Sequence, residues 1–340
     1  MIRRNNRNRK DDANTELKTD QVNHNKKQEE NKRSISMSQS FSNFVLQSYD
    51  ELPEWYQDNE FIKNYYRPVS NSFKISLKSI FKLHNESFNI WSHAIPLVPV
   101  AVVLIYKFVS AVATLFTLDF INSTYFKRQL LMIFFYSSPA VMFFFSATLH
   151  TFMNHSHKIS KRLSCFDYTG IIAMINGGIV TYCYYVFYDY PTSQLIYMLS
   201  NIVISVVSLF FVNNDNFYTS AYRPIRGILF VSLGMAATIP AIHLVIQHGL
   251  YHCFKEFYLL QIILMAVAYI FGALMFVIRF PEKQFPGKCD LIGSSHNILH
   301  LFVVVATGIL IYAVESLKYK RESIEDNVLW YASYNSTVLQ

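Results

Sequence analysis

Charged side chains are scarce in this sequence, and that scarcity excludes an ordinary soluble domain. Asp, Glu, Lys and Arg make up 16% of the 340 residues, whereas soluble globular proteins carry about 25%. Hydrophobic residues make up 52% of the chain. The composition therefore predicts a membrane protein that crosses the bilayer several times.

Cysteine is also scarce, and its spacing argues against a thiolate metal site. The chain has four cysteines, Cys165, Cys183, Cys253 and Cys289, and no two of them form a C-x-x-C pair. Cys165 and Cys289 are expected on the cytosolic side of the membrane, where thiols stay reduced. Free thiols are therefore predicted, and a histidine site is favoured over a zinc–thiolate site.

The N-terminal segment lacks large apolar side chains. Asn, Lys, Arg, Gln and Ser dominate residues 1–40, so this segment is expected to be disordered. It has no apolar core of the kind that a cleaved signal peptide requires, and the first span is expected to act as the insertion signal. Residues 1–50 are predicted to be a disordered, basic, cytosolic tail.

Seven apolar stretches follow, each close to the ~20 residues that cross a bilayer as a helix. The predicted fold is an all-α seven-transmembrane helix bundle at 93–316, followed by a short tail at 317–340. Residues 51–92 are expected to be an amphipathic juxtamembrane segment, with an interfacial helix over 72–89 before the first span. The predicted spans are 93–113, 129–152, 167–188, 194–213, 226–247, 257–279 and 295–316.

The distribution of Lys and Arg predicts the orientation of the chain. The first fifty residues carry ten of them, and more follow the second, fourth and sixth spans. This bias places the N-terminus in the cytosol and the C-terminus on the other side. The net charge of +7 is attributed to topology and attraction to anionic lipid, so nucleic acid is not an expected partner.

Three histidines form the strongest candidate site. His296 and His300 are four residues apart, which puts both rings on one face of a helix, roughly 40° apart around its axis. His150 ends the second span, while Asp167 and His296 begin the third and seventh. Alternating topology therefore places these groups at the same membrane face. Three imidazoles with an open fourth position are typical of a catalytic zinc site.

Other histidines are expected to be ordinary. His243, His248 and His252 include a second pair with i, i+4 spacing, but they fall at the opposite membrane face without an acidic residue at a span border. They are interpreted as solvated loop histidines. His155 and His157 lie in the polar loop after the second span and are interpreted in the same way.

Several motifs carry a family resemblance: residues 66–68 (YRP), 79–81 (SIF), 84–93 (HNESFNIWSH), 146–170, 281–283 (PEK), 285–288 (FPGK) and 294–300 (SSHNILH). They resemble the progestin and adipoQ receptor family, which is related to haemolysin III proteins and includes adiponectin receptors. The similarity covers about residues 50–316. It implies a seven-helix bundle with a cytosolic N-terminus and a zinc ion near the cytosolic leaflet.

The resemblance also implies roles for single residues. It places zinc on His150, His296 and His300, with Asp167 near the water at the open position and Ser146 one turn before the first ligand. The wider superfamily includes alkaline ceramidases, whose pattern of Ser, Asp and three His is complete here.

The chemistry of these residue types agrees with the implied roles. Zinc held by three neutral histidines can polarise an amide carbonyl and lower the pKa of a water molecule to about 7. Asp167 would move the proton. Ser146 would orient water or stabilise an oxyanion, or would be a helix-packing hydroxyl. For His84, Asn85 and Glu86, a hydrogen-bond network that docks the amphipathic segment is favoured over a catalytic role.

Two functions are consistent with this sequence. One is an adiponectin receptor-like signalling protein that uses Zn²⁺ to hydrolyse a lipid amide, with ceramide or a related sphingolipid as substrate or ligand. The other is a non-enzymatic receptor or a zinc- or lipid-homeostasis protein with a structural zinc. An extracellular ligand and a homo-oligomer are left open. The expected location is the plasma membrane or an endomembrane.

Overall fold

Helices make up nearly all of the regular structure in the described part of the chain. The computed structural model describes residues 45–116, 124–214, 217 and 220–338, and most of the predicted disordered tail lies outside them. Within residues 47–340, seven helical segments are long and apolar enough to cross a membrane. The predicted all-α, seven-span fold is confirmed, and the cytosolic location of the N-terminus stays a prediction.

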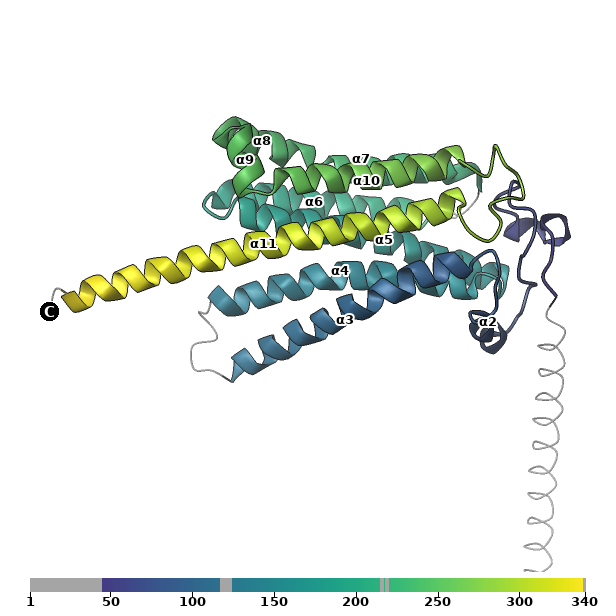
Figure 1. Ribbon diagram of the computed structural model, residues 1–340, viewed down its shortest axis with the longest axis horizontal. Helices are drawn as coiled ribbons and strands as arrows, with labels where there is room; N and C mark the ends of the chain where they lie inside the picture. The colour runs from purple at the N-terminus through teal and green to yellow at the C-terminus, as the bar shows by residue number, and fades with distance from the viewer. Residues whose placement is uncertain (1–44, 117–123, 215–216, 218–219, 339–340) are drawn as a thin grey trace, which may run out of the picture. The chain divides into compact units, whose positions relative to one another are not determined.

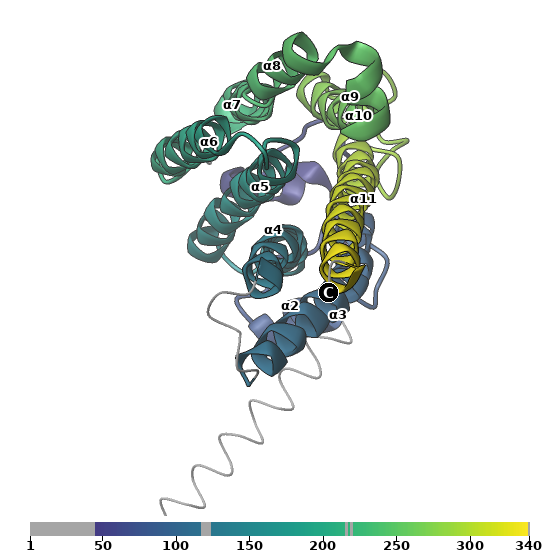
Figure 2. The same cartoon turned by 90° about the vertical axis from the view of Figure 1, so that its left-hand side faces the viewer.

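The spans pack as neighbours in chain order (Figure 1). Seen along their axes, α11 lies beside both α3 and α10, so the last span is next to the first (Figure 2). The membrane helices are α3 (Ser87–Leu115), α4 (Thr124–Phe152), α5 (His157–Val186), α6 (Pro191–Val212), the pair α7 (Arg223–Met235) and α8 (Thr238–His248), α10 (Leu259–Ile278) and α11 (Ser295–Val338). Shorter elements are η1 (Tyr49–Glu51), η2 (Glu54–Tyr56), α2 (Phe73–Ser79), η5 (Ser220–Tyr222) and α9 (Leu250–Glu256).

Several spans differ from their predicted bounds. α3 and α4 begin six and five residues before the predicted 93 and 129. α5 begins at His157, ten residues before the predicted 167, because the helix continues through polar residues that precede the apolar run. α11 continues through the stretch that was expected to be a short tail. The fifth span is two helices, since Pro240 has no N–H to donate to the carbonyl of Ala236, four residues earlier.

The region between the fifth and sixth spans, which was expected to be a loop at the membrane face opposite the candidate site, is partly helical. His243 lies inside α8, with its Nδ1 2.9 Å from the hydroxyl of Tyr197. His252 lies in α9. The interpretation of these residues as loop histidines was therefore wrong, because the glycine between α8 and α9 produces a bend and not an extended loop. All four cysteines are free, as predicted.

The segment before the first span is less helical than predicted. α2 covers seven residues, and a turn separates it from α3. Upstream, Gln47 and Tyr66 form an antiparallel bridge. The backbone amides of Lys63 and Asn64 donate to the carboxylate of Asp290 at 3.0 Å each. This segment is therefore tied to the loop between α10 and α11.

Glycines on α5 allow the two histidine-bearing helices to approach it closely. A Cβ at Gly177 would lie 2.5 Å from the Cβ of Ser138 on α4. A Cβ at Gly178 would lie 2.7 Å from a methyl group of Leu310 on α11. Real side chains do not fit at such distances, so these glycines serve helix packing. The same close packing holds α4 and α11 against one central helix.

Candidate metal centre

Three histidines from two distant spans converge at one end of the bundle. His150 lies in the last turn of α4, and His296 and His300 lie in the first two turns of α11. One nitrogen from each ring lies within 4.8 Å of the others. No other group of this kind occurs among the residues that the structure describes. The structure thus brings together the three residues that the sequence singled out.

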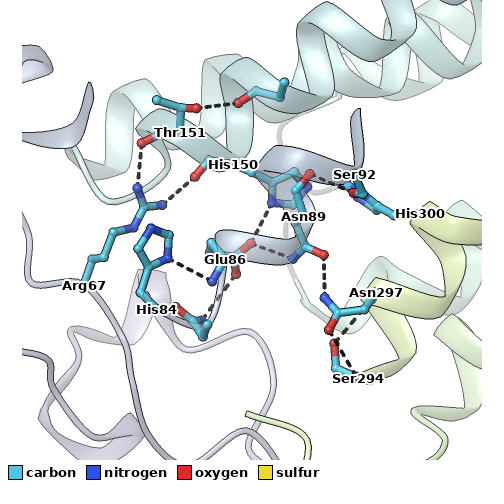
Figure 3. A network of polar contacts seen from close by, with 12 residues as sticks. Arg67, His84, Glu86, Asn89, Ser92, His150, Thr151, Ser294, Asn297 and His300 are labelled. Atoms are coloured by element: carbon cyan, nitrogen blue, oxygen red, sulfur yellow. Dashed lines mark hydrogen bonds and ion pairs between the residues drawn. The ribbon is translucent and has the colours of Figure 1, made fainter. Parts of the chain in front are cut away.

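His150 is held from both its backbone and its ring (Figure 3). Its Nδ1 donates to Oε2 of Glu86 at 2.7 Å. The guanidinium of Arg67, which is fully buried, donates to the carbonyls of His150 and Thr151. These carbonyls end α4 and have no partner within the helix, so a cation is favourable there. Arg67 therefore fixes the backbone of His150 while Glu86 fixes its ring.

Glu86 links the two histidine-bearing helices. Its Oε2 also accepts from Asn89 at 2.7 Å, and Asn89 in turn accepts from Asn297, the neighbour of His296, at 2.7 Å. Burial raises the pKa of Glu86, but the hydrogen bond from His150, the electrostatic interactions with His150 and His296, and the hydrogen bond from Asn89 together outweigh burial and hold this pKa well below its usual range. Glu86 is therefore an anion at neutral pH.

His84 supports Glu86 from the other side. Its Nδ1 accepts from the backbone N–H of Glu86 at 3.1 Å. Burial and the neighbouring Arg67 guanidinium lower the pKa of His84 to about 3. The ring is therefore neutral and able to accept this bond. The docking network expected for these residues exists, and it extends further than predicted, as far as His150.

His300 is oriented by two adjacent residues of α3. Ser92 Oγ lies 3.0 Å from Nδ1 of His300, and the same hydroxyl donates to the carbonyl of Asn89. Since the hydroxyl proton is used there, Nδ1 of His300 is the donor to Ser92. The ring of His93 stacks on His300 with centroids 3.9 Å apart and an interplanar angle of 10°. These contacts fix the tautomer and the plane of His300.

This arrangement fits a metal ion. The Nδ1 atoms of His150 and His300 are occupied by Glu86 and Ser92, which leaves each Nε2 with a lone pair. Nε2 of His150 is buried without a protein partner. A buried polar atom of this kind is costly unless something binds it. Zinc-binding histidines are usually neutral imidazoles that donate the N–H of the non-ligating ring nitrogen to a carboxylate or another oxygen.

The predicted acid lies at the same place. Asp167 is on α5 and Ser146 is one turn before His150 on α4, within hydrogen-bonding reach of the Asp167 carboxylate. Both residues line a cavity of about 810 Å³ together with the three histidines. Sequence reasoning therefore selected five residues that share one cavity.

The sequence-based prediction missed the residues that orient the three histidines. Glu86 was assigned only to docking, and no role was given to Ser92, His93 or Arg67. One signal was present, because all but Arg67 belong to one polar motif, HNESFNIWSH, at the start of an apolar run. Polar groups at a span border need partners, but the motif alone does not indicate which residues those partners are.

The fold and the buried histidines define an integral, multi-pass membrane protein. Similarity to known proteins then places it in a family. The sequence profile described as "Haemolysin-III related" matches residues 81–311. The chain therefore belongs to the progestin and adipoQ receptor family of haemolysin III-related membrane proteins, as the motifs indicated.

Individual relatives agree with this assignment. "Progestin and adipoQ receptor-like protein 1" of Caenorhabditis elegans is 34% identical over 273 residues, covering 80% of this chain and 61% of that protein. "Adiponectin receptor protein" of Drosophila melanogaster is 34% identical over 271 residues, covering 79% and 59%. "ADIPOR-like receptor IZH2" of Saccharomyces cerevisiae is 35% identical over 270 residues, covering 77% and 80%. The chain spans about 60% of the length of the two animal relatives.

Proposed function

We propose that this protein is a zinc-dependent lipid amidohydrolase within an adiponectin receptor-like membrane protein. The observation that carries the proposal is the set of His150, His296 and His300, whose nitrogens lie within 4.8 Å of one another at the end of a cavity that also contains Asp167. His150, His296 and His300 would hold the ion. When bound, zinc supplies Lewis acidity toward a carbonyl or a water molecule.

The shape and lining of the cavity support a lipid substrate. The cavity runs from the histidines and Asn59 at one end of the bundle to Leu259, the first residue of α10, whose N-terminus lies at the opposite membrane face. Between these ends it is lined by apolar side chains such as Met142, Ile262 and Val303. A polar head and a long acyl chain match this division. Ceramide, a lipid amide, has both.

The residues around the histidines can perform amide hydrolysis. Asp167 takes a proton from the attacking water and returns it to the leaving nitrogen. The carbon–oxygen bond forms, the carbon–nitrogen bond breaks, and the products are a fatty acid and a sphingoid base. Ser146 holds the Asp167 carboxylate and offers a hydroxyl to the carbonyl oxygen.

The test compares metal content with turnover in protein reconstituted in lipid. The His296→Ala, His300→Ala double variant should lose stoichiometric zinc and fatty-acid release, whereas His248→Ala, His252→Ala should keep both. Asp167→Asn should keep zinc but reduce ceramide hydrolysis by roughly 10²–10⁴. Wild-type release equal to that of the double variant, across several acyl lengths, would leave the second candidate, a receptor or homeostasis protein with a structural zinc.

A further inference from the structure

The short helix α2 is oriented with its polar side inward. Ser76 and Ser79 are fully buried, at 0% exposure, while Phe73 and Leu77 are 53% and 51% exposed. In a helix the two pairs are centred about 110° apart around the axis, because each residue turns the chain by about 100°. A soluble protein would bury the phenylalanine and expose the serines. The outward face of α2 is therefore suited to an apolar surrounding.

The buried serines fix the rotation of the helix. Ser79 Oγ accepts from Arg67 at 3.0 Å, and Ser76 Oγ donates to Oδ1 of Asn154 at 2.9 Å. Arg67 is itself fully buried. Turning α2 about its axis would leave these groups unpaired, which is costly in a buried site. The fold thus imposes the half-exposed positions of Leu77 and of Phe73, whose ring also contacts Phe152 and His155 on its inner side.

The position of α2 relative to the bilayer follows from Trp91. Its indole nitrogen, in the second turn of α3, donates to the carbonyl of Ile80 at 3.3 Å. The outward apolar surface of α3 begins there and continues with Ile95, which is 64% exposed. Tryptophan is enriched at the membrane interface. Phe81, in the turn that follows α2, is 80% exposed, so this end of the segment lies at the level where the bilayer begins.

Two exposed lysines flank the apolar stripe. Lys74 and Lys78 are four residues apart, on the same side of α2 and next to Phe73 and Leu77. Residues 61–85 contain no Asp or Glu, so this segment carries only positive charge. A helix with this pattern lies in the interface plane and favours anionic lipid.

We propose that the outward face of α2, formed by Phe73, Lys74, Leu77 and Lys78, is a binding site for anionic phospholipid headgroups at the bilayer surface. The two apolar side chains enter the acyl boundary, and the two ammonium groups contact a headgroup phosphate. This site is independent of the histidine centre and of any hydrolysis.

Native mass spectrometry of the purified protein tests the proposal. Wild type, titrated with phosphatidylserine or phosphatidylcholine of matched acyl chains, should retain phosphatidylserine preferentially. Lys74→Gln, Lys78→Gln should weaken the apparent affinity for phosphatidylserine by roughly tenfold to thirtyfold and leave that for phosphatidylcholine unchanged. Lys74→Arg, Lys78→Arg should retain binding because the charges remain.

A matched control uses the start of α5. Lys158 and Arg162 are also exposed, are four residues apart and lie at the same membrane face. Lys158→Gln, Arg162→Gln removes the same charge and should leave phosphatidylserine binding unchanged. An equal loss in both double variants would show general charge attraction and overturn the site. Retention of the two lipids to the same extent by wild type would overturn it as well.

Discussion

Glu86 and Ser92 supply no ligand atom to the histidine set, yet they decide which nitrogen each ring presents. A carboxylate on Nδ1 of His150 and a hydroxyl on Nδ1 of His300 leave both Nε2 atoms directed away from their partners. Such partners orient metal-binding rings and increase their basicity. Residues at the start of the first span therefore orient a candidate metal site whose histidines lie on the second and seventh spans.

Replacing Glu86 with Gln should weaken zinc binding without abolishing it. The amide can still accept from His150, but the negative charge that raises the basicity of the ring is lost. We expect a decrease of roughly 10–100-fold in zinc affinity, measured by competition with a chelator in detergent. Glu60→Gln is the control, because Glu60 is 62% exposed and pairs with Arg279. Equal affinities for Glu86→Gln and wild type would contradict an orienting role.

At the scale of single residues, the sequence predicted the convergence of the three histidines better than the surroundings of these histidines. Alternating spans force His150 and His296 to the same membrane face, whatever the details of packing. The contact between Glu86 and His150 depends on how the chain folds back before the first span, where Arg67 and His84 meet the end of α4. The periodicity of apolar residues in the sequence does not indicate this contact.

The glycines of α5 determine how closely its neighbours pack. A Cβ at Gly170 would lie 2.9 Å from the Cα of Met142, a backbone atom that cannot rotate away. Gly308 on α11 has no atom within 4 Å of the corresponding position. The two sites therefore provide a matched pair for the same substitution.

Gly170→Ala should lower the free energy of unfolding by about 1–3 kcal/mol through overpacking against α4. Gly308→Ala should leave it unchanged or raise it by up to about 1 kcal/mol, since alanine favours the helix. Thermal unfolding of the purified protein in detergent measures both. A larger loss for Gly308→Ala than for Gly170→Ala would show that the α4–α5 contact is not the tight one.

At the scale of elements, hydropathy predicted the spans but not their ends. It detects apolar composition, so it missed the polar first turns of α5 that carry His157. Hydropathy also predicted a continuous fifth span. Pro240 interrupts the backbone hydrogen bonds of the helix, but it does not lower the apolar content of the sequence there. The seven long helices could be predicted without tertiary information. The interruption of the fifth span and the helical turns beyond the apolar runs could not.

Seven spans require the two ends of the chain to lie on opposite sides of the membrane. The basic N-terminal segment predicts that its side is the cytosol. An N-terminal tag should therefore react with antibody only after cells are permeabilised, and a C-terminal tag should react without it or within the lumen of an organelle. Tags on one side would contradict the seven-span count and the shared face of the histidines.

The histidine set draws on the second span and on the last one. A membrane protein is made from its N-terminal end, so His150 and its partner Glu86 are already in the bilayer while His296 and His300 are still being synthesised. Six spans precede them. Metal binding at the proposed centre would consequently be a final step in biogenesis, because a chain that stops before α11 lacks two of the three histidines. Occupancy of the proposed centre would then distinguish a finished protein from an incomplete one.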